Sequence, residues 1–429
     1  MSRRSLDRRR FLKDTTAALA ANGLGGAIWP RVVHARRRDG PPRVAAIITE
    51  YRGYSHADVI AGRFIQGYTL GSEPYWPRTK VVSMYVDQFP PSDLSRGMAA
   101  GHGIEIHPTI EAALTMGRGE LAVDGVLIIG EHGNYPYNDK GQRLYPRRRF
   151  FEETVNTFQE VGATAPVFND KHLSATWDDA RWMYDMARRM RFPLMAGSSL
   201  PTTWRKPDLE LPLDCELEGA LAVGFSDLEA YGFHALETLQ SMIERRRGGE
   251  TGVRAVTCLE GAAVWEAAHD GRWSRTLLDA ALDRIEKKTP GRPEQNCQNA
   301  AAFLIEHVDG LRSAVLMLSG HASEFAFAAQ VRGERRAAAS LFWLQEPVFG
   351  HFSYLVHNIE SMFLTGQETY PPERTLLTTG VLDAVIQSRF EGHKRIETPW
   401  LATVAYRPSA HPVRRAKFAD FGTPRDSSL

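Results

Sequence analysis

The sequence predicts a protein of the α/β class with two domains: a doubly wound parallel sheet, and a second domain of α+β type built on an antiparallel sheet. Up to about residue 200, short apolar runs alternate with segments of helical periodicity, which is the order of parallel strands joined by helical crossovers. Beyond residue 217, hairpin turns join the apolar runs instead. The chain has 429 residues, enough for two separate cores.

Strands and helices alternate through the first domain, which we assign to residues 43–205. The runs with the pattern of strands are VAAIIT (44–49), KVVSMYVD (80–87), VDGVLIIG (123–130), APVFND (165–170) and FPLMAGSS (192–199). VDGVLIIG is apolar throughout, as a strand buried on both faces requires. Helical patterns lie at 57–68, 93–103, 150–162 and 177–191. This order is typical of a Rossmann-like domain.

The second domain, assigned to residues 206–407, begins with the strand pattern LEGALAVG (217–224) and a long helical pattern that stops at Gly248-Gly249. Two hairpins follow, with turns at Asp309-Gly310 and at 332–334. Helical patterns at about 351–364 and 373–390 come next. We expect the basic, proline-containing residues 408–429 to form a loose tail.

The N-terminus has the order of an export signal. DRRRFLK (7–13) precedes a weakly apolar stretch rich in Ala and Gly, which resembles a twin-arginine signal. We therefore assign residues 1–35 to the signal and expect a periplasmic or other extracytoplasmic protein; the alternative is a disordered basic tail. No later segment approaches the roughly 18 apolar residues of a membrane span, so we expect none in the mature chain.

Charge and cysteine content argue against other classes of protein. The net charge is +1, which gives no electrostatic case for binding nucleic acid. The three cysteines, Cys215, Cys258 and Cys297, are far apart and odd in number. Neither a disulfide framework nor a zinc knuckle is indicated, and we expect three buried thiols.

The serial order of these features resembles the Gfo/Idh/MocA family of sugar-related oxidoreductases over nearly all of residues 43–407. The places that carry the resemblance are the strand–turn–helix with Gly53, His56 and Ala57, Asp87 after the second strand, VDGVLIIG, APVFNDKHLS, helix 177–191 before FPLMAGSS, YGFHALETL, and the run from Gly366 to Arg389. The resemblance implies a Rossmann domain with an open-faced antiparallel sheet, NAD or NADP as cofactor, a carbohydrate substrate, and a homo-oligomer formed through the C-terminal sheet.

The resemblance also implies roles for individual residues. The family's lysine maps onto Lys171 and its helix histidine onto His234, and these two would handle the proton of a sugar hydroxyl. The expected cofactor contacts are Glu50, Gly53, His56, Asp87, Glu131 and Asp170. The family's acid four residues before the helix histidine falls at Ala230, and the glutamate and proline of its Glu-Lys-Pro motif are replaced by Asp170 and His172.

The first turn departs most from the family pattern. Counting back from His56, the three family glycines fall at Ile48, Glu50 and Gly53, so only the last remains. The second glycine lets the backbone approach a pyrophosphate. At about 4 Å and an effective dielectric near 20, a carboxylate there would cost roughly 4 kcal/mol against a phosphate. The turn therefore indicates a Rossmann-like fold more clearly than it indicates a bound dinucleotide.

Position alone selects further candidates. The segments 49–56, 131–145 and 169–172 must gather at the carboxyl ends of the strands, and the middle one is long and rich in donors and acceptors. We take His132 from it as a catalytic residue. Candidates for substrate binding are Asn134, Tyr135, His172, Trp204, Arg205, Tyr231 and Glu237. The alternatives left open are a solvated loop, a surface lysine at 171, a histidine packed between domains and a structural hinge at 204–205.

Two hypotheses of function follow. The first is an exported oxidoreductase, or an enzyme working through a keto intermediate, that uses NAD or NADP on a carbohydrate. The second is a cofactor-free descendant: a carbohydrate-binding protein, or a lyase or hydratase using a metal or acid–base chemistry in the same cleft. A structural partner in an extracytoplasmic complex, using Phe and Trp side chains along 340–344, is a third. We predict no metal, since nothing in the spacing of His132, His172 and His234 demands one. The arginines at 147–149 are expected to be solvated.

Overall fold

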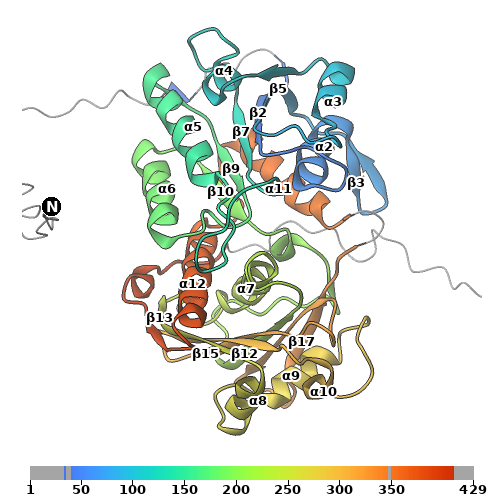
Figure 1. Cartoon of the computed structure of the whole chain (residues 1–429), viewed down its shortest axis with the longest axis vertical. Coiled ribbons are helices and arrows are strands. Elements are labelled where there is room, and N and C mark those ends of the chain that lie inside the picture. Colours follow the sequence, from blue (N-terminus) through green and yellow to red (C-terminus); the bar gives the residue numbers. More distant parts are fainter. Residues whose placement is uncertain (1–32, 35–39, 346–348, 410–429) are drawn as a thin grey trace, which may run out of the picture.

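The computed structural model of the chain describes residues 33–34, 40–345 and 349–409. The assigned export signal lies outside these residues except for positions 33 and 34, and the assigned tail lies outside them from position 410. Figure 1 shows two lobes stacked along the long axis, each built on one large sheet. The predicted α/β class and the two-sheet architecture are confirmed.

The first sheet has six strands, all parallel, in the order β10-β9-β7-β2-β5-β6. Its strands are β2 Arg43–Ile48, β5 Lys80–Val86, β6 Glu105–His107, β7 Gly125–Ile129, β9 Val167–Asp170 and β10 Leu194–Gly197. The chain winds outward from β2 in one direction and from β7 in the other. Ligands of doubly wound sheets bind beyond the carboxyl ends of the strands at such a switch point.

Helices cover both faces of this sheet: α4 Ile110–Thr115, α5 Arg147–Val161 and α6 Trp177–Met190 on one, and α2 His56–Gln66, α3 Ser95–His102 and α11 Phe352–Thr365 on the other. Successive residues of a strand point to opposite faces. In β2, Ala45 and Ile47 pack in the core under α4 and α5, whereas Ala46 and Ile48 pack in the core under α2 and α11. This double burial is why the strand is apolar at every position after Arg43.

The second sheet has eight strands in the order β11-β17-β16-β12-β15-β14-β13-β18. Its strands are β11 Arg205–Lys206, β12 Leu217–Gly224, β13 Val253–Glu260, β14 Ala301–His307, β15 Arg312–Met317, β16 Phe325–Val331, β17 Ala338–Phe342 and β18 Ile396–Glu397. The two predicted hairpins form, as β14–β15 and β16–β17. The sheet is mixed rather than antiparallel throughout, because β12 pairs with β15 in parallel.

Both faces of this sheet are covered as well. The face toward the first lobe carries α7 Ala230–Ile243 and α12 Glu373–Phe390, and the far face carries α8 Ala262–His269, α9 Arg275–Leu282 and α10 Pro293–Asn296. The sheet therefore differs from the expected open-faced one. The amphipathic helix α9 needs an apolar surface, and it buries Leu277 and Leu278 against Leu221 and Val223 of β12.

Covering the far face changes the expectation for oligomerisation. Phe342 of β17, one of the side chains expected to make a contact between copies, is fully buried. Trp343 is only partly exposed and stacks with Lys206. A homo-oligomer through this sheet stays a prediction, and these two aromatic residues do not supply its surface.

Helix α11 belongs to the second domain by its place in the sequence but packs in the first lobe. It packs on α2 and on the small hairpin of β3 Tyr68–Leu70 and β4 Glu73–Tyr75, and its Leu355 and Ile359 join the core of the first lobe. The remaining elements are β1 Val33–His34 paired with β8 Ala163–Thr164, and the 3-10 turns Leu200–Thr202 and Leu401–Thr403. Within the described residues, no helix is long and apolar enough to cross a membrane.

Candidate functional site

A cavity of about 200 Å³ lies where the carboxyl ends of β2, β7, β9 and β10 face α7. Its walls are Tyr54, His56, Val59, Glu131, His132, Lys171, Ser199, Leu200, Tyr231, His234, Phe325, Leu344, Phe349, His351 and Phe352. Figure 1 shows α7 between the two sheets, so both lobes contribute to this wall. We call this region the pocket end of the crevice.

A buried group of three charges forms the floor of the pocket end. Glu131 follows β7 directly, and its Oε1 atom lies 3.2 Å from Nζ of Lys171, which follows β9. The Arg147 guanidinium, at the start of α5, contacts Oε2 of the same carboxylate. Burial alone would raise the pKa of Glu131, but Lys171 and Arg147 hold it well below its ordinary value. The group therefore carries one extra positive charge in a dry site.

The backbone at Lys171 is unusual. Its φ is +61°, a conformation that residues other than glycine seldom adopt. The amide of Lys171 donates to the carbonyl of Gly197 at the end of β10, across 3.1 Å. The left-handed conformation turns the chain sharply after β9 and keeps the ammonium inside the crevice, where it is almost fully buried. Strain of this kind concentrates at functional sites.

A histidine and an aspartate form a second buried pair. His56 is the first residue of α2, which Ser55 caps through its side chain. Its Nδ1 atom lies 2.6 Å from Oδ2 of Asp170, the last residue of β9. The Asp170 side chain is 1% exposed and that of His56 is 13% exposed. The imidazole thus stands between a buried carboxylate and the cavity.

Three more histidines line the same cavity. Burial lowers the pKa of His132 to about 4. Burial lowers the pKa of His351 to about 3, and burial together with Lys171 lowers that of His234 well below its ordinary range. Nδ1 of His234 lies 2.5 Å from the Ser198 hydroxyl. These three imidazoles are neutral at pH 7.

Several polar atoms of the pocket end are buried without a partner. Within the described part of the chain, no hydrogen bond reaches Nε2 of His132, the Ser199 hydroxyl or Nδ1 of His351, and all three residues line the cavity. Buried polar groups in proteins are nearly always hydrogen-bonded, so each exception needs an explanation. The three atoms themselves are buried and are not exposed on the cavity surface.

The other end of the crevice, around Asp87, is different, and we call it the Asp87 end. Oδ1 of Asp87 accepts hydrogen bonds from the Tyr85 hydroxyl and from Arg149, each at 2.5 Å, and Oδ2 accepts one from the Tyr135 hydroxyl at 2.7 Å. The Gln88 side chain bonds the backbone of Asn134 in both directions. These bonds hold the loop 131–146 against the end of β5. Both carboxylate oxygens of Asp87 therefore have hydrogen-bond partners within the protein.

The turn between β2 and α2 is also satisfied by its own groups. Glu50 is nearly buried and pairs with Arg52 at 2.7 Å. The amides of Arg52 and Asp58 donate to the Ser55 hydroxyl, and the amide of Tyr54 donates to the Asp58 carboxylate. Backbone amides at a helix start commonly bind anions. Here three such amides already donate to side chains, and the carboxylates of Glu50 and Asp58 lie in the same turn.

The structure gathers some of the predicted site residues and separates others. The pocket end holds Lys171, His234, His132, His56, Glu131 and Tyr231 in its wall, with Asp170 behind His56. Asn134 and Tyr135 lie at the Asp87 end, and Glu50 and Gly53 lie in the turn. Other predicted residues lie outside the cavity wall. His172 bonds to Arg147, and Trp204 is buried beside β11. Arg205 pairs with Glu210, and Glu237 accepts a hydrogen bond from Thr378.

Sequence reasoning missed other residues of the site. Arg147 was expected to be a solvated arginine, yet it is 1% exposed and pairs with Glu131. The close fit at Gly130, where a Cβ atom would lie 2.6 Å from Cγ of Arg147, shows how the helix start presses this side chain inward. Ser199 and His351 gave no local signal, because tertiary packing alone brings them to the cavity.

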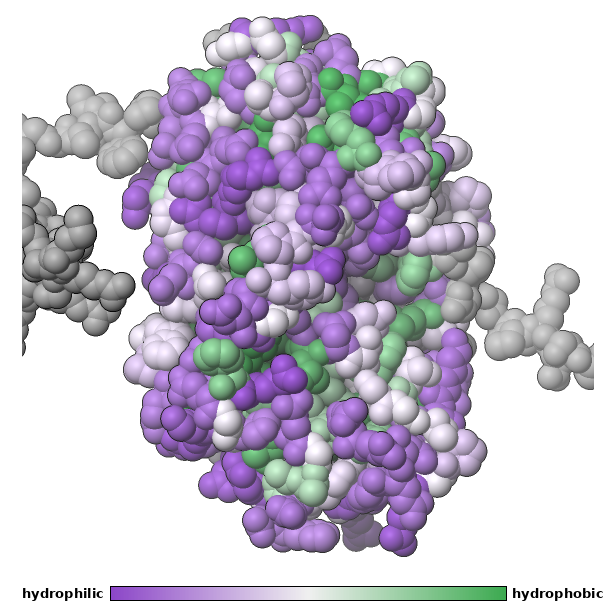
Figure 2. Space-filling view, in the orientation of Figure 1, coloured by the Kyte–Doolittle hydropathy of each residue, from purple (hydrophilic) through white to green (hydrophobic). Residues whose placement is uncertain are grey.

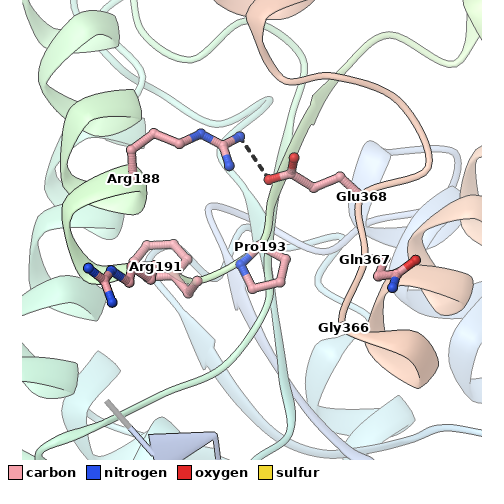
Figure 3. Close-up of a pocket in the computed structure, with 7 residues that line it drawn as sticks. Arg188, Arg191, Pro193, Gly366, Gln367 and Glu368 are labelled. Carbon is pink, nitrogen blue, oxygen red and sulfur yellow. Dashed lines mark hydrogen bonds and ion pairs between the residues drawn. The ribbon is translucent and has the colours of Figure 1, made fainter. Parts of the chain in front are cut away.

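A larger hollow lies elsewhere. It measures about 480 Å³ and sits between the end of α6 and the segment 366–368. Figure 3 shows Arg188 reaching across it to Glu368, with Arg191 directed away from that pair. Because it opens near the amino end of β10 and its central charges are paired, we do not regard it as the reaction site. No cluster of His, Cys, Asp or Glu within the described residues is arranged to hold a metal ion.

No protein-family model matches the sequence, and a search of curated proteins found no match. Solved structures do match. GenD2 from gentamicin A biosynthesis, in complex with NAD, has a TM-score of 0.53 at 14% identity, over 87% of this chain and 99% of that one. Apo scyllo-inositol dehydrogenase from Lactobacillus casei has a TM-score of 0.52 at 9% identity, over 83% and 98%. An oxidoreductase from Agrobacterium radiobacter, in complex with NAD+, L-tartaric acid and magnesium, has a TM-score of 0.51 at 13% identity, over 83% and 98%.

These likenesses establish the fold. The chain has the two-domain architecture of Gfo/Idh/MocA-type oxidoreductases, so the resemblance inferred from the sequence is confirmed at the level of the fold.

Proposed function

We propose that the protein is an enzyme of the Gfo/Idh/MocA type, an oxidoreductase that acts on a hydroxyl group of a carbohydrate or related polyol bound at the pocket end. One observation carries the proposal: His56, His132 and His234 line a cavity between the two lobes, and the charged pair Lys171–Glu131 lies in its wall. The fold is shared with solved dehydrogenases, which supports the class of reaction.

The size and lining of the cavity support a small, ring-shaped substrate. Its volume of about 200 Å³ is below the roughly 300–1,000 Å³ of sites for drug-sized ligands. The Tyr231 and Phe325 rings stand in its wall, and aromatic faces pack well on sugar rings. Lys171 is placed to stabilise negative charge that develops on a substrate oxygen. These features suit a monosaccharide or an inositol better than a polymer.

NAD or NADP is the cofactor that the fold implies, and the structures of GenD2 and of the Agrobacterium oxidoreductase contain NAD. The donor set of this chain does not fit a dinucleotide in the usual mode. The turn presents the carboxylates of Glu50 and Asp58 where a pyrophosphate would lie, and the hydrogen-bonding oxygens of Asp87 are already engaged by Tyr85, Tyr135 and Arg149. We therefore derive no step through the dinucleotide.

This misfit favours a second candidate function. A cofactor-free descendant would use the same pocket end for acid–base chemistry, as a lyase or hydratase of carbohydrates, or would bind carbohydrate without reaction. The pocket residues would serve it unchanged, because none of Lys171, His56 and Glu131 depends on the Asp87 end for its partners.

One experiment separates the two candidates. The full chain is purified folded and then denatured, and the supernatant is assayed for nicotinamide nucleotide. In parallel, the folded protein is titrated with NAD(H) and NADP(H) by calorimetry and screened against inositols and hexoses with and without these nucleotides. Bound or titrating nucleotide together with nucleotide-dependent turnover supports the oxidoreductase. Turnover without any nucleotide supports the second candidate, and the first is then abandoned.

We further propose that the protein is exported, because the order DRRRFLK followed by an apolar stretch matches a twin-arginine signal. Residues 1–40 fused to a reporter protein should carry it out of the cytoplasm. Replacing Arg8, Arg9 and Arg10 together by lysine should keep the reporter inside. Equal export of both fusions would contradict the assignment.

A further inference from the structure

We propose that His56 and Asp170 form the proton acceptor of the pocket end, with His56 as the catalytic base and Asp170 as a positioning residue. The inference deepens the proposed function and rests on it, since it names the group that takes a proton from the bound hydroxyl. It applies to the oxidoreductase, because oxidation of a hydroxyl group to a carbonyl requires removal of the hydroxyl proton.

The geometry of the pair fixes the state of the imidazole. The short contact of 2.6 Å joins Nδ1 of His56 to a carboxylate oxygen of Asp170, so Nδ1 carries the proton and donates it. In a neutral imidazole the other nitrogen is then an acceptor. No hydrogen bond within the described chain occupies Nε2 of His56, and the ring stands in the cavity wall. The acceptor atom therefore remains available to a ligand.

The surroundings hold this ring in place. The start of α2 anchors its backbone through the Ser55 cap. Phe352, at the start of α11, packs against the ring edge-to-face with centroids 5.2 Å apart, and the His132 ring does so at 5.3 Å. Asp170 is fixed by strand pairing, because β9 pairs with β10 as far as Gly197. Both members of the pair are thus held by regular secondary structure, as a catalytic constellation requires.

The other polar groups that face the pocket are less suited to accept a proton. Lys171 is held by Glu131, and Glu131 is held by two cations, which keep its pKa well below the ordinary value. His132 accepts from Arg52 at 3.3 Å and has a pKa near 4. The low pKa values of His234 and His351 likewise make them weak bases. Among the histidines that line the cavity, His56 alone lies within hydrogen-bonding distance of a carboxylate, which would stabilise its protonated form.

The step itself is a proton transfer. The O–H bond of the substrate hydroxyl breaks, its electron pair stays on the oxygen, and a new N–H bond forms at Nε2 of His56. The resulting imidazolium faces the Asp170 carboxylate, and the substrate oxyanion faces the positive group of Lys171 and Arg147. Charge therefore develops where opposite charges already stand.

Chemical labelling tests the pair without a known substrate. The folded full chain is treated with diethyl pyrocarbonate at pH 8, and the labelling rate of each histidine is measured by peptide mass spectrometry, with the exposed His102 as internal reference. An activated, unprotonated Nε2 should make His56 react at least as fast as His102 despite its low exposure. In Asp170→Asn the ratio should fall at least about twofold, because the carboxylate no longer accepts the Nδ1 proton and Nε2 becomes less nucleophilic, and Asp170→Glu should restore part of it.

A matched control is Asp185→Asn, which removes an exposed carboxylate paired with Arg181 and should leave the ratio unchanged. An unreactive His56 in the wild-type protein, or an equal ratio in folded wild type and Asp170→Asn, would overturn the proposal; the first result needs no variant to fold. If the substrate screen has found a turnover, Asp170→Asn should lower kcat with little change in KM. A failed label with a successful screen would reject the pair alone, whereas the converse would reject the proposed reaction and leave the pair standing.

Discussion

The two ends of the crevice differ in how their polar groups are bonded. At the Asp87 end, tyrosine, arginine and glutamine side chains of the chain itself satisfy Asp87 and fasten the loop 131–146. At the pocket end, Ser199, His132 and His351 keep buried atoms without partners. A satisfied polar network is typical of structure, and buried polar atoms without partners are rare in folded proteins. The contrast supports the proposal that the pocket end is the binding site.

The molecular surface agrees with this division. Figure 2 shows a face that is mostly hydrophilic with only scattered hydrophobic patches.

The largest expected effect lies at the pocket end. Glu131→Gln leaves the buried cations Lys171 and Arg147 without their carboxylate. Breaking a buried pair from one side costs about 3–5 kcal/mol, so we expect the free energy of unfolding to fall by that amount in urea titrations. Glu153→Gln, which removes an exposed partner of Arg149, is the control and should change it by less than about 1 kcal/mol. Equal effects would show that the buried group is not special.

The second-largest expected effect is a loss of folding stability in acid, caused by the buried histidines of the pocket end. The pKa values of His132 and His351 fall from 6.5 to about 4 and about 3 in the folded protein. Below pH 6.5 the unfolded chain therefore binds more protons than the folded one, and each histidine removes up to about 1.4 kcal/mol of stability per pH unit as the pH falls. Urea titrations at pH 7 and pH 5 measure this loss, and His132→Gln should reduce its slope. An unchanged slope in the variant would contradict the buried, neutral assignment.

Glu237 should act in the opposite direction. Its burial behind the pocket raises its pKa from 4.5 to about 7, so the folded chain holds a proton that the unfolded chain has released. The stabilising contribution is complete below pH 4.5 and is lost as the pH rises through 7, by about 1.4 kcal/mol per unit at most. Glu237→Gln should therefore lose stability more steeply than the wild-type protein as the pH falls from 6.5 to 5, because the buried histidines then act unopposed. An equal or shallower loss in the variant would contradict the raised pKa of Glu237.

The smallest expected effect on stability is at the Asp87 end. Tyr135→Phe removes one hydroxyl from Asp87, which keeps Tyr85 and Arg149. The loss of one such hydrogen bond should cost about 1 kcal/mol, measured again by urea titration. A loss as large as that of Glu131→Gln would mean that the two ends are equally dependent on their networks.

Much of the fold could be predicted from the sequence, because local patterns determine it. The apolar run VDGVLIIG became the buried strand β7, and Asp309-Gly310 became a hairpin turn. The covered far face of the second sheet was missed, since periodicity shows that α9 has an apolar stripe but not which surface the stripe meets.

The site was less predictable for a physical reason. Lys171, His132 and His234 were found because strand ends and a helix face place them at the cleft. The partnership of His56 with Asp170 joins residues 114 positions apart, and the inward turn of Arg147 depends on packing against Gly130. Such pairings exist only after the strands have taken their register, and no local pattern encodes them.

One measurement tests the contrast between the two ends most directly. NAD+ and NADP+ are titrated by calorimetry into the wild-type protein and into the double variant Glu50→Gly, Tyr135→Phe, which removes the carboxylate of the turn and loosens the closed end. The variant should bind dinucleotide at least about tenfold more tightly than the wild type, because a carboxylate–phosphate repulsion of a few kcal/mol has been removed. Equal affinity in the two proteins, whether tight or undetectable, would contradict it.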